Sequence, residues 1–193
     1  SIVTLFVFTA KAQLLFNNDP DFTIESAGLL HIEGSVEIGL SGFFHNSGEV
    51  YVEGDWENNT SIIGPNNGLA HSLNSGKVIL FGDAVQLISG SPTTFNDLVI
   101  RGNAHKVLDI ETFVGGTNGT LTLENQGLHL NTHTLYITNP ANTALNALTG
   151  SPVSYIESED QSINSGAIHW EIGASTGAYT IPWARSSLQL ETI

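Results

Sequence analysis

The chain of 193 residues is long enough for one domain with a sizeable core, or for one continuous repeat array. Only 12% of its residues are charged, against roughly 25% in an average soluble protein, and a formal net charge of −14 remains. A surface this acidic repels phosphate backbones and anionic lipid, and nucleic acid and membrane surfaces are therefore not expected as partners. Cations, neutral glycans and basic proteins remain possible partner classes.

The N-terminal stretch has an apolar run at residues 2–8, followed by an A-x-A pattern at Ala10-Lys11-Ala12. The run is too short to span a bilayer, and the combination is typical of the end of a secretory signal peptide. We therefore predict that residues 1–12 are a signal-peptide remnant, cleaved before Gln13; a buried first strand is the alternative. No other run approaches the ~20 apolar residues of a transmembrane helix. The absence of Cys is compatible with an exported bacterial protein without disulfides.

The next stretch, NNDPDF (17–22), places oxygen-bearing side chains at alternate positions: Asn17, Asp19 and Asp21. Hard cations such as calcium accept these ligands, so the three residues are a candidate metal site. The stretch lacks the glycine and the bidentate glutamate of a calcium-binding loop, and an N-terminal capping turn is the alternative. Calcium is the one cofactor that the sequence leaves open.

From residue 28 onward, six stretches follow one seven-residue template, in which the third and fifth residues are always aliphatic. The copies are GLLHIEG (28–34), GEVYVEG (48–54), GKVILFG (76–82), NDLVIRG (96–102), GTLTLEN (119–125) and HTLYITN (133–139). This alternation predicts a short strand with its third and fifth side chains inward and its second and fourth outward. Ile79 and Val99 are apolar at the outward fourth position, so we expect a neighbouring loop or chain to cover them.

The copies are separated by 20, 28, 20, 23 and 14 residues, with shorter strands in the gaps. This recurrence predicts an all-β fold, a right-handed parallel β-helix (β-solenoid) with one rung every ~20 residues. An antiparallel β-sandwich is the alternative. We assign residues 13–148 to the solenoid and residues 149–193 to a further β segment truncated at the C-terminus. Only NTALNAL (142–148) shows a helical pattern.

The second copy contains a cluster of carboxylates around an indole, Glu49, Glu53, Asp55 and Glu57 with Trp56. Glu49 and Glu53 lie two pleats apart on one strand, ~13 Å, which exceeds the ~5–9.5 Å that glycoside hydrolysis requires. We expect Asp55 to turn the chain and Trp56 to cap the rungs or pack beneath a loop. The turn itself, through Asp55, Trp56, Asn58 and Asn59, is the candidate ligand-binding site.

Four stretches together resemble large secreted repeat-containing surface proteins, of adhesin type, from Bacteroidota. They are FFHNSGEVYVEGDWENN (43–59), GKVILFGDAVQLISGSPTTFNDLVI (76–100), GTLTLENQGLHLNTHTLYITN (119–139) and HWEIGASTGAYTIPWA (169–184). The resemblance implies a β-helical or sandwich-like passenger region, carried across the outer membrane by the type IX route. It also implies a secreted or outer-surface location on a bacterium.

The remaining polar groups provide no recognisable catalytic arrangement. His129 and His133 are four residues apart, but on strand and turn this spacing does not pair ligands as it does on a helix. The acidic run YIESED, with Glu157, Glu159 and Asp160, is interpreted as a charged strand edge rather than a metal site.

We therefore expect a non-enzymatic structural or adhesive segment, a rigid spacer or display surface whose loops contact glycan or protein. A carbohydrate-active enzyme and a calcium-stabilised glycan-binding module are the alternatives; ligand identity and oligomeric state stay open.

Overall fold

A computed structural model of the chain describes residues 3–4, 12–18, 21–60, 70–71, 76–116, 118–148, 154–158, 165–184 and 190–191. The regular elements within these ranges are all β-strands. The N-terminal strands are β1 (Val3–Thr4), β2 (Ala12–Asn17), β3 (Asp21–Ile24), β4 (Leu29–Ile38), β5 (Phe43–Asn46), β6 (Glu49–Val52), β7 (Trp56–Asn58) and β8 (Ala70–His71). The central strands are β9 (Lys77–Leu80), β10 (Gln86–Gly90), β11 (Thr93–Phe95), β12 (Asp97–Ile100), β13 (Lys106–Leu108), β14 (Thr112–Val114) and β15 (Leu121–Glu124). The C-terminal strands are β16 (Gly127–His129), β17 (Thr134–Ile137), β18 (Leu145–Leu148), β19 (Tyr155–Glu157), β20 (Ala167–Trp170), β21 (Trp183–Ala184) and β22 (Leu190–Glu191).

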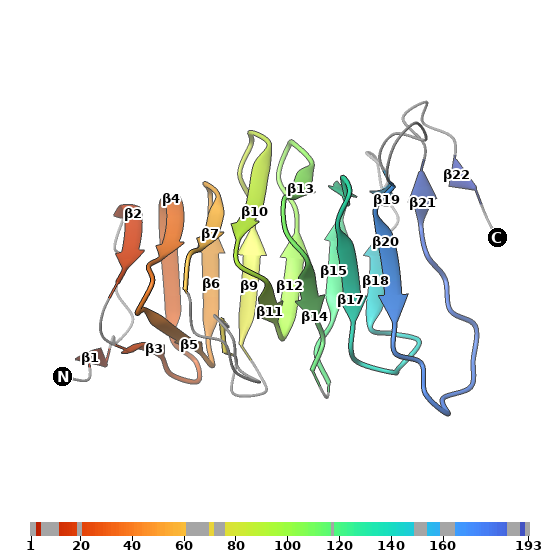
Figure 1. The fold of residues 1–193 in the computed structure, drawn as a ribbon, viewed down its shortest axis with the longest axis horizontal. Coiled ribbons are helices and arrows are strands. Elements are labelled where there is room, and N and C mark those ends of the chain that lie inside the picture. Colours follow the sequence, from red (N-terminus) through yellow and green to blue (C-terminus); the bar gives the residue numbers. More distant parts are fainter. Residues whose placement is uncertain are drawn as a thin grey trace.

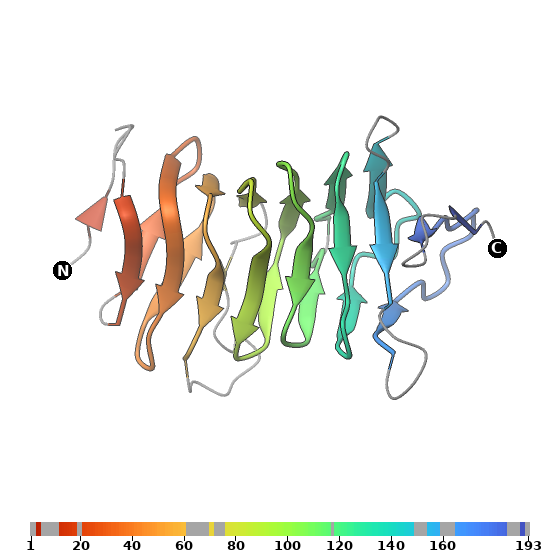
Figure 2. The ribbon, with the colours of Figure 1, turned by 90° about the horizontal axis from the view of Figure 1, so that it is seen from above.

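The strands stack in three columns along the long axis of the molecule, and the chain visits each column in turn (Figures 1 and 2). The first column is β6-β9-β12-β15-β18, the second is β7-β10-β13-β16-β19, and the third is β11-β14-β17-β20. The long strand β4 joins the first two columns, because its first half pairs with β6 and its second half with β7. Strands β1, β3, β5 and β8 form a further sheet at the N-terminal end.

Pairing between successive rungs is parallel and in register. In the first column, Val50 pairs with Val78, which pairs with Leu98, which pairs with Leu121. Among the described residues, the one antiparallel pair joins β21 to β22. An antiparallel β-sandwich cannot have this pairing, so the alternative fold is wrong, and the all-β architecture of parallel strands is confirmed.

Five of the six template copies occupy the first column, at β4, β6, β9, β12 and β15. The sixth, with Leu135 and Ile137, forms β17 of the third column and pairs with β14. Its expected place beside β15 is taken by β18, which lies inside the stretch 142–148 that the sequence suggested as helical. The helical interpretation of 142–148 was wrong, since Leu145–Leu148 is a strand. Period-two alternation marks any strand with an inward face and does not identify the column, so the sixth copy lies apart from the other five.

The inward positions of the template form the core. The ten aliphatic residues of the five stacked copies are all buried: Leu30, Ile32, Val50, Val52, Val78, Leu80, Leu98, Ile100, Leu121 and Leu123. Each side chain lies above its register partner in the neighbouring rung, so the apolar surface is removed from water in continuous ladders. Ile79 and Val99 are buried as well, although they face outward. Arg101 crosses this face of β9 to lie 5.2 Å from the centre of the Tyr51 ring.

An aromatic cluster with edge-to-face contacts fills the core where β7 faces β11 of the third column and β5 of the N-terminal sheet. Trp56 lies between Phe44 and Phe95, with ring centroids 5.6 and 5.3 Å away. The indole is fully buried, and its Nε1 has no hydrogen-bond partner within the part of the chain that the structure describes. Trp56 is therefore a core residue within the stack, and the expectation that it caps the rungs or packs beneath a loop was wrong, because its alternation with Glu57 directs it inward.

The segment assigned to a separate C-terminal β region continues the same stack, since β19 pairs with β16 and β20 pairs with β17. At the N-terminal end, β2 begins at Ala12 and pairs with β4, and Val3–Thr4 pairs with β3. The other residues of the predicted signal peptide lie outside the described residues, and its cleavage stays a prediction. Within the described ranges, no helix has the length and apolar character needed to cross a membrane.

Candidate functional site

The turn proposed from the sequence divides into buried and accessible residues. Trp56 and Asn58 are fully buried, so neither is available to a ligand in this structure. Asp55 is half-buried and acts within the fold, since its Oδ1 accepts a hydrogen bond from Leu87 N at 2.8 Å. Asn59 is the member of the set that reaches a surface groove.

Asn58 belongs to a group of buried asparagines that tie turns to neighbouring rungs. Its Oδ1 accepts from Thr60 N at 3.2 Å, and its Nδ2 donates to Thr93 Oγ1 at 3.1 Å. Asn46 repeats the pattern with Gly48 N and Lys77 O, and Asn139 does so with Ala141 N and Gly119 O. Each amide satisfies two backbone or hydroxyl groups that the turn would otherwise bury without a partner.

The same role explains Asn17, which the sequence suggested as a metal ligand. Asn17 is buried, and its Nδ2 donates to Phe43 O at 2.7 Å, so its amide nitrogen links β2 to β5. Asp19 lies outside the described residues, and Asp21 is described only as the first residue of β3. Elsewhere in the described chain, no group of three or more His, Asp or Glu side chains has an arrangement that could hold a metal. Calcium binding by Asn17, Asp19 and Asp21 stays an untested prediction.

An open groove of about 560 Å³ lies across the carboxyl ends of β2, β4, β7 and β10, which are side by side in Figure 1. It is lined by Phe16, Asn18, Glu37, Gly39, Leu40, Asn59, Gly90 and Ser91. Phe16 and Leu40 are 55% and 62% exposed, which is unusual for large apolar side chains. The groove therefore combines apolar walls with a carboxylate and two amides.

Strand register arranges the outward residues beside the groove in two rows, and in the first row Phe16 and Glu37 are the groove-lining residues. The first row follows from the pairs Phe16–Glu37, Glu37–Glu57 and Glu57–Ser89. The second row is Asn18, Gly39, Asn59 and Ser91, the residues two positions further along the same chain segments. Backbone bonds extend the ladder to this second row, with Gly39 N donating to Asn17 O at 2.7 Å and Asn59 N to Ile38 O at 2.6 Å.

Glycines keep the floor of the groove low. A Cβ on Gly39 would lie 2.2 Å from Asn18 Oδ1, and a Cβ on Gly90 would lie 2.2 Å from Asn58 O. Gly90 also has φ +91°, which side-chain-bearing residues rarely adopt. Either position with a larger residue would raise the floor or shift the backbone.

Glu37 and Glu57 are the in-register carboxylates that the sequence did not bring together. Adjacent strands are ~4.8 Å apart, so the two groups face each other across one rung. Asn59, which lines the groove, donates from Nδ2 to Glu57 Oε1 at 2.8 Å. Strand pairing, and not spacing in sequence, creates this contact, because the two residues are twenty positions apart.

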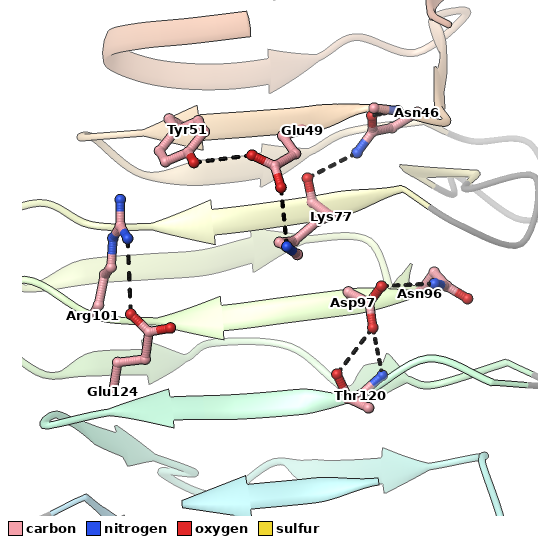
Figure 3. A network of polar contacts seen from close by, with 10 residues as sticks. Asn46, Glu49, Tyr51, Lys77, Asn96, Asp97, Arg101, Thr120 and Glu124 are labelled. Atoms are coloured by element: carbon pink, nitrogen blue, oxygen red, sulfur yellow. Dashed lines mark hydrogen bonds and ion pairs between the residues drawn. The ribbon is translucent and has the colours of Figure 1, made fainter. Parts of the chain in front are cut away.

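A polar network covers the outward face of the first column (Figure 3). Glu49 accepts from Lys77 Nζ and from the Tyr51 hydroxyl, each at 3.0 Å, and these bonds hold the pKa of Glu49 below its ordinary value. The bond to Glu49 raises the pKa of Lys77, while burial and the bond to Glu49 raise that of Tyr51. Further along, Asp97 accepts from Thr120 N at 2.8 Å. The Lys77–Glu49 and Asp97–Thr120 contacts join neighbouring strands, and the Tyr51–Glu49 bond lies within β6, so these carboxylates are engaged within the fold.

A second cluster, on the outward face of the second column, contains His105, His129, Tyr155 and Glu157. The two imidazoles stack with centroids 3.8 Å apart, and His129 Nε2 lies 3.1 Å from the Tyr155 hydroxyl and 3.3 Å from Glu157 Oε2. Gly127 pairs with Tyr155 and makes room for its ring, since a Cβ there would lie 2.2 Å from Tyr155 Cζ. The sequence analysis missed this cluster, because its residues come from three rungs.

Lys106 is a fully buried cation in the second column. Its Nζ donates to Gly82 O at 2.8 Å, and its register partner Gln86 accepts from Gly82 N at 2.7 Å. Burial lowers the pKa of Lys106 to about 8, against a weak opposing effect of Asp83. Lys106 therefore closes the turn at Gly82 from inside the molecule and faces no groove.

Comparisons of the chain with protein-family models, with curated proteins and with solved structures each found no match.

Proposed function

We propose that the chain is a right-handed parallel β-helix and serves as a non-enzymatic structural or adhesive segment of a secreted or cell-surface bacterial protein. In this role it is a rigid spacer or display surface, and its loops contact glycan or protein. The resemblance to secreted Bacteroidota surface proteins supports export by the type IX route as part of the proposal.

The observation that supports this proposal best is the uninterrupted parallel register along the molecule. Strands one circuit apart pair from β6 to β18 in the first column and from β7 to β19 in the second. Such a stack has nearest-neighbour stability and a fixed axis, as a spacer requires.

The distribution of polar groups is a second support. Buried asparagines bond to adjacent rungs, and outward pairs such as Lys77–Glu49 link neighbouring strands. Because these side chains are occupied within the fold, they stiffen the stack and are not aligned for reaction chemistry.

Small-angle X-ray scattering tests the proposed role. A monodisperse rod profile, with a cross-section that stays constant along its length, is the expected result. A compact, isotropic profile would contradict the spacer function.

Incubation with linear polysaccharides tests the non-enzymatic part of the proposal. If new reducing ends formed, and did not form with Glu37→Gln, the proposal would be replaced by a glycoside hydrolase that uses the in-register pair Glu37 and Glu57.

Two further tests address export and calcium. We expect the secreted product to begin at Gln13, as shown by mass spectrometry; retention of residues 1–12 would contradict the signal-peptide prediction. A thermal unfolding midpoint that is unchanged by a chelator would remove the alternative of a calcium-stabilised module.

A further inference from the structure

We propose that the groove across β2, β4, β7 and β10 binds a neutral linear polysaccharide, with the sugar chain parallel to the long axis of the stack. The inference rests on the proposed adhesive function and names its ligand class and its site. The groove is the place where exposed apolar side chains and hydrogen-bonding groups meet, and its volume of about 560 Å³ lies within the roughly 300–1,000 Å³ of small-molecule sites.

The chemistry of the lining fits a sugar. A pyranose ring has an apolar C–H face and a rim of hydroxyl groups, so it needs a flat apolar contact together with donors and acceptors. Phe16 and Leu40 provide exposed apolar surface. Glu37 provides a carboxylate that accepts hydrogen bonds from sugar hydroxyls, and Asn18 and Asn59 provide amides that can donate to them or accept from them.

Charge selects against acidic sugars. The chain carries a net charge of −14, Glu37 lines the groove, and Glu57 is its register partner on the next strand. A uronic acid or sulfated polymer would meet this negative potential with no lysine or arginine in the lining to compensate it. The ligand is therefore neutral.

The spacing of the groove favours a sugar over a peptide. Its lining residues follow one another once per strand, ~4.8 Å along the axis, over four strands, with polar side chains at Asn18, Asn59 and Ser91 and the glycine Gly39 between the first two. An extended peptide repeats every ~3.3 Å and loses register with such a row after one or two residues. A hexose unit is about as long as one strand spacing, so successive rings lie over successive strand ends, and Gly39 leaves room for a ring between Asn18 and Asn59.

Isothermal titration of the full chain with neutral hexasaccharides of β-1,4-linked and β-1,3-linked glucose tests the inference. We expect binding of at least one of them, weakened about tenfold or more by Phe16→Ala and by Glu37→Gln. Leu148→Ala and Glu111→Gln are the matched controls, since they change exposed apolar and acidic side chains outside the groove, and they should leave affinity unchanged. The thermal midpoint of each variant confirms that the fold is retained.

The opposing outcomes are distinct. No binding of either sugar, or equal binding by groove and control variants, overturns the inference, and a rod profile in scattering would show that the structural role survives. Binding of a lysine nonapeptide in place of the sugars, lost in Glu37→Gln, would reassign the groove to basic peptides. Tighter binding of oligogalacturonate than of the glucans would overturn the charge argument.

Discussion

At the scale of single residues, the buried polar side chains decide how the turns are held. Asn58 is adjacent to Asn59, yet the first is fully buried and bonded to the next rung, while the second lines a groove. The sequence identified this turn as special but did not separate the two, because both are asparagine in a polar stretch. Alternation from Trp56 would have predicted the different burial of the two asparagines, because position 58 faces inward with Trp56 and position 59 faces outward.

Removing the two amides separately should therefore lower the free energy of unfolding by very different amounts. Asn58→Ala leaves Thr60 N and Thr93 Oγ1 without their bonds and should lower the free energy of unfolding by roughly 2–3 kcal/mol. Asn59→Ala should lower it by less than about 0.5 kcal/mol, because its bond to Glu57 is exposed. Denaturant titration of both variants measures the difference; equal losses would contradict the inward and outward assignment.

The buried Lys106 predicts a pH dependence of stability. Its pKa is about 8 in the folded protein against an ordinary value of 10.5, so between these pH values the unfolded chain binds a proton that the folded chain does not. The free energy of unfolding therefore rises with pH across this window, by up to roughly 3 kcal/mol at about 1.4 kcal/mol per pKa unit.

Lys106→Gln isolates this contribution, since Gln86 occupies the equivalent position one rung away. The variant should be the more stable protein at pH 7, and its advantage over the unmodified chain should shrink as pH approaches 10. Urea titrations at a series of pH values measure it. A difference that stays constant with pH would show that Lys106 is not neutralised on folding.

At the scale of elements, the seven-residue template was sufficient to find the core but not to place every strand. Leu135 and Ile137 have the same alternation as Val50 and Val52, yet they lie in another column. Nothing local distinguishes them, because the column is set by the number of residues in the intervening turns. The histidine cluster was invisible for the same reason, since pairing across rungs brought His129 to Glu157.

Within one strand, inward and outward substitutions should differ sharply. Val50→Asp puts a carboxylate in the aliphatic ladder and should lower the free energy of unfolding by several kcal/mol. Glu49→Gln keeps the shape and loses a half-exposed ion pair with Lys77, so its effect should stay below about 1 kcal/mol. Chemical denaturation compares the two, and similar losses would invalidate the assignment of faces.

At the scale of the whole molecule, the circuit is the repeating unit, and it should be removable. Deleting residues 78–97 joins Lys77 to Leu98, which is the register partner of Val78. Lys77 then still faces Glu49, and Leu98 stacks on Val50. The prediction follows from nearest-neighbour stability, in which each circuit contacts only those beside it.

We expect this deletion to give a soluble protein that unfolds cooperatively, with a denaturant m-value reduced in line with its smaller buried area. Deleting residues 78–87 is the control, because half a circuit joins the first column to the second and breaks every later register. Circular dichroism and guanidinium titration distinguish them. If the deletion of residues 78–97 also failed to give a folded protein, the stability of the stack would not be a sum over circuits.

The amine inside the second column also offers a measure of motion. With a pKa of about 8, Lys106 is more nucleophilic near neutral pH than an ordinary lysine, but its burial keeps reagents away. An acylating reagent can reach it only when the turn at Gly82 opens, so its labelling rate reports the opening frequency of one circuit. The acylation rate of Lys106 thus measures how often one circuit of the stack opens locally.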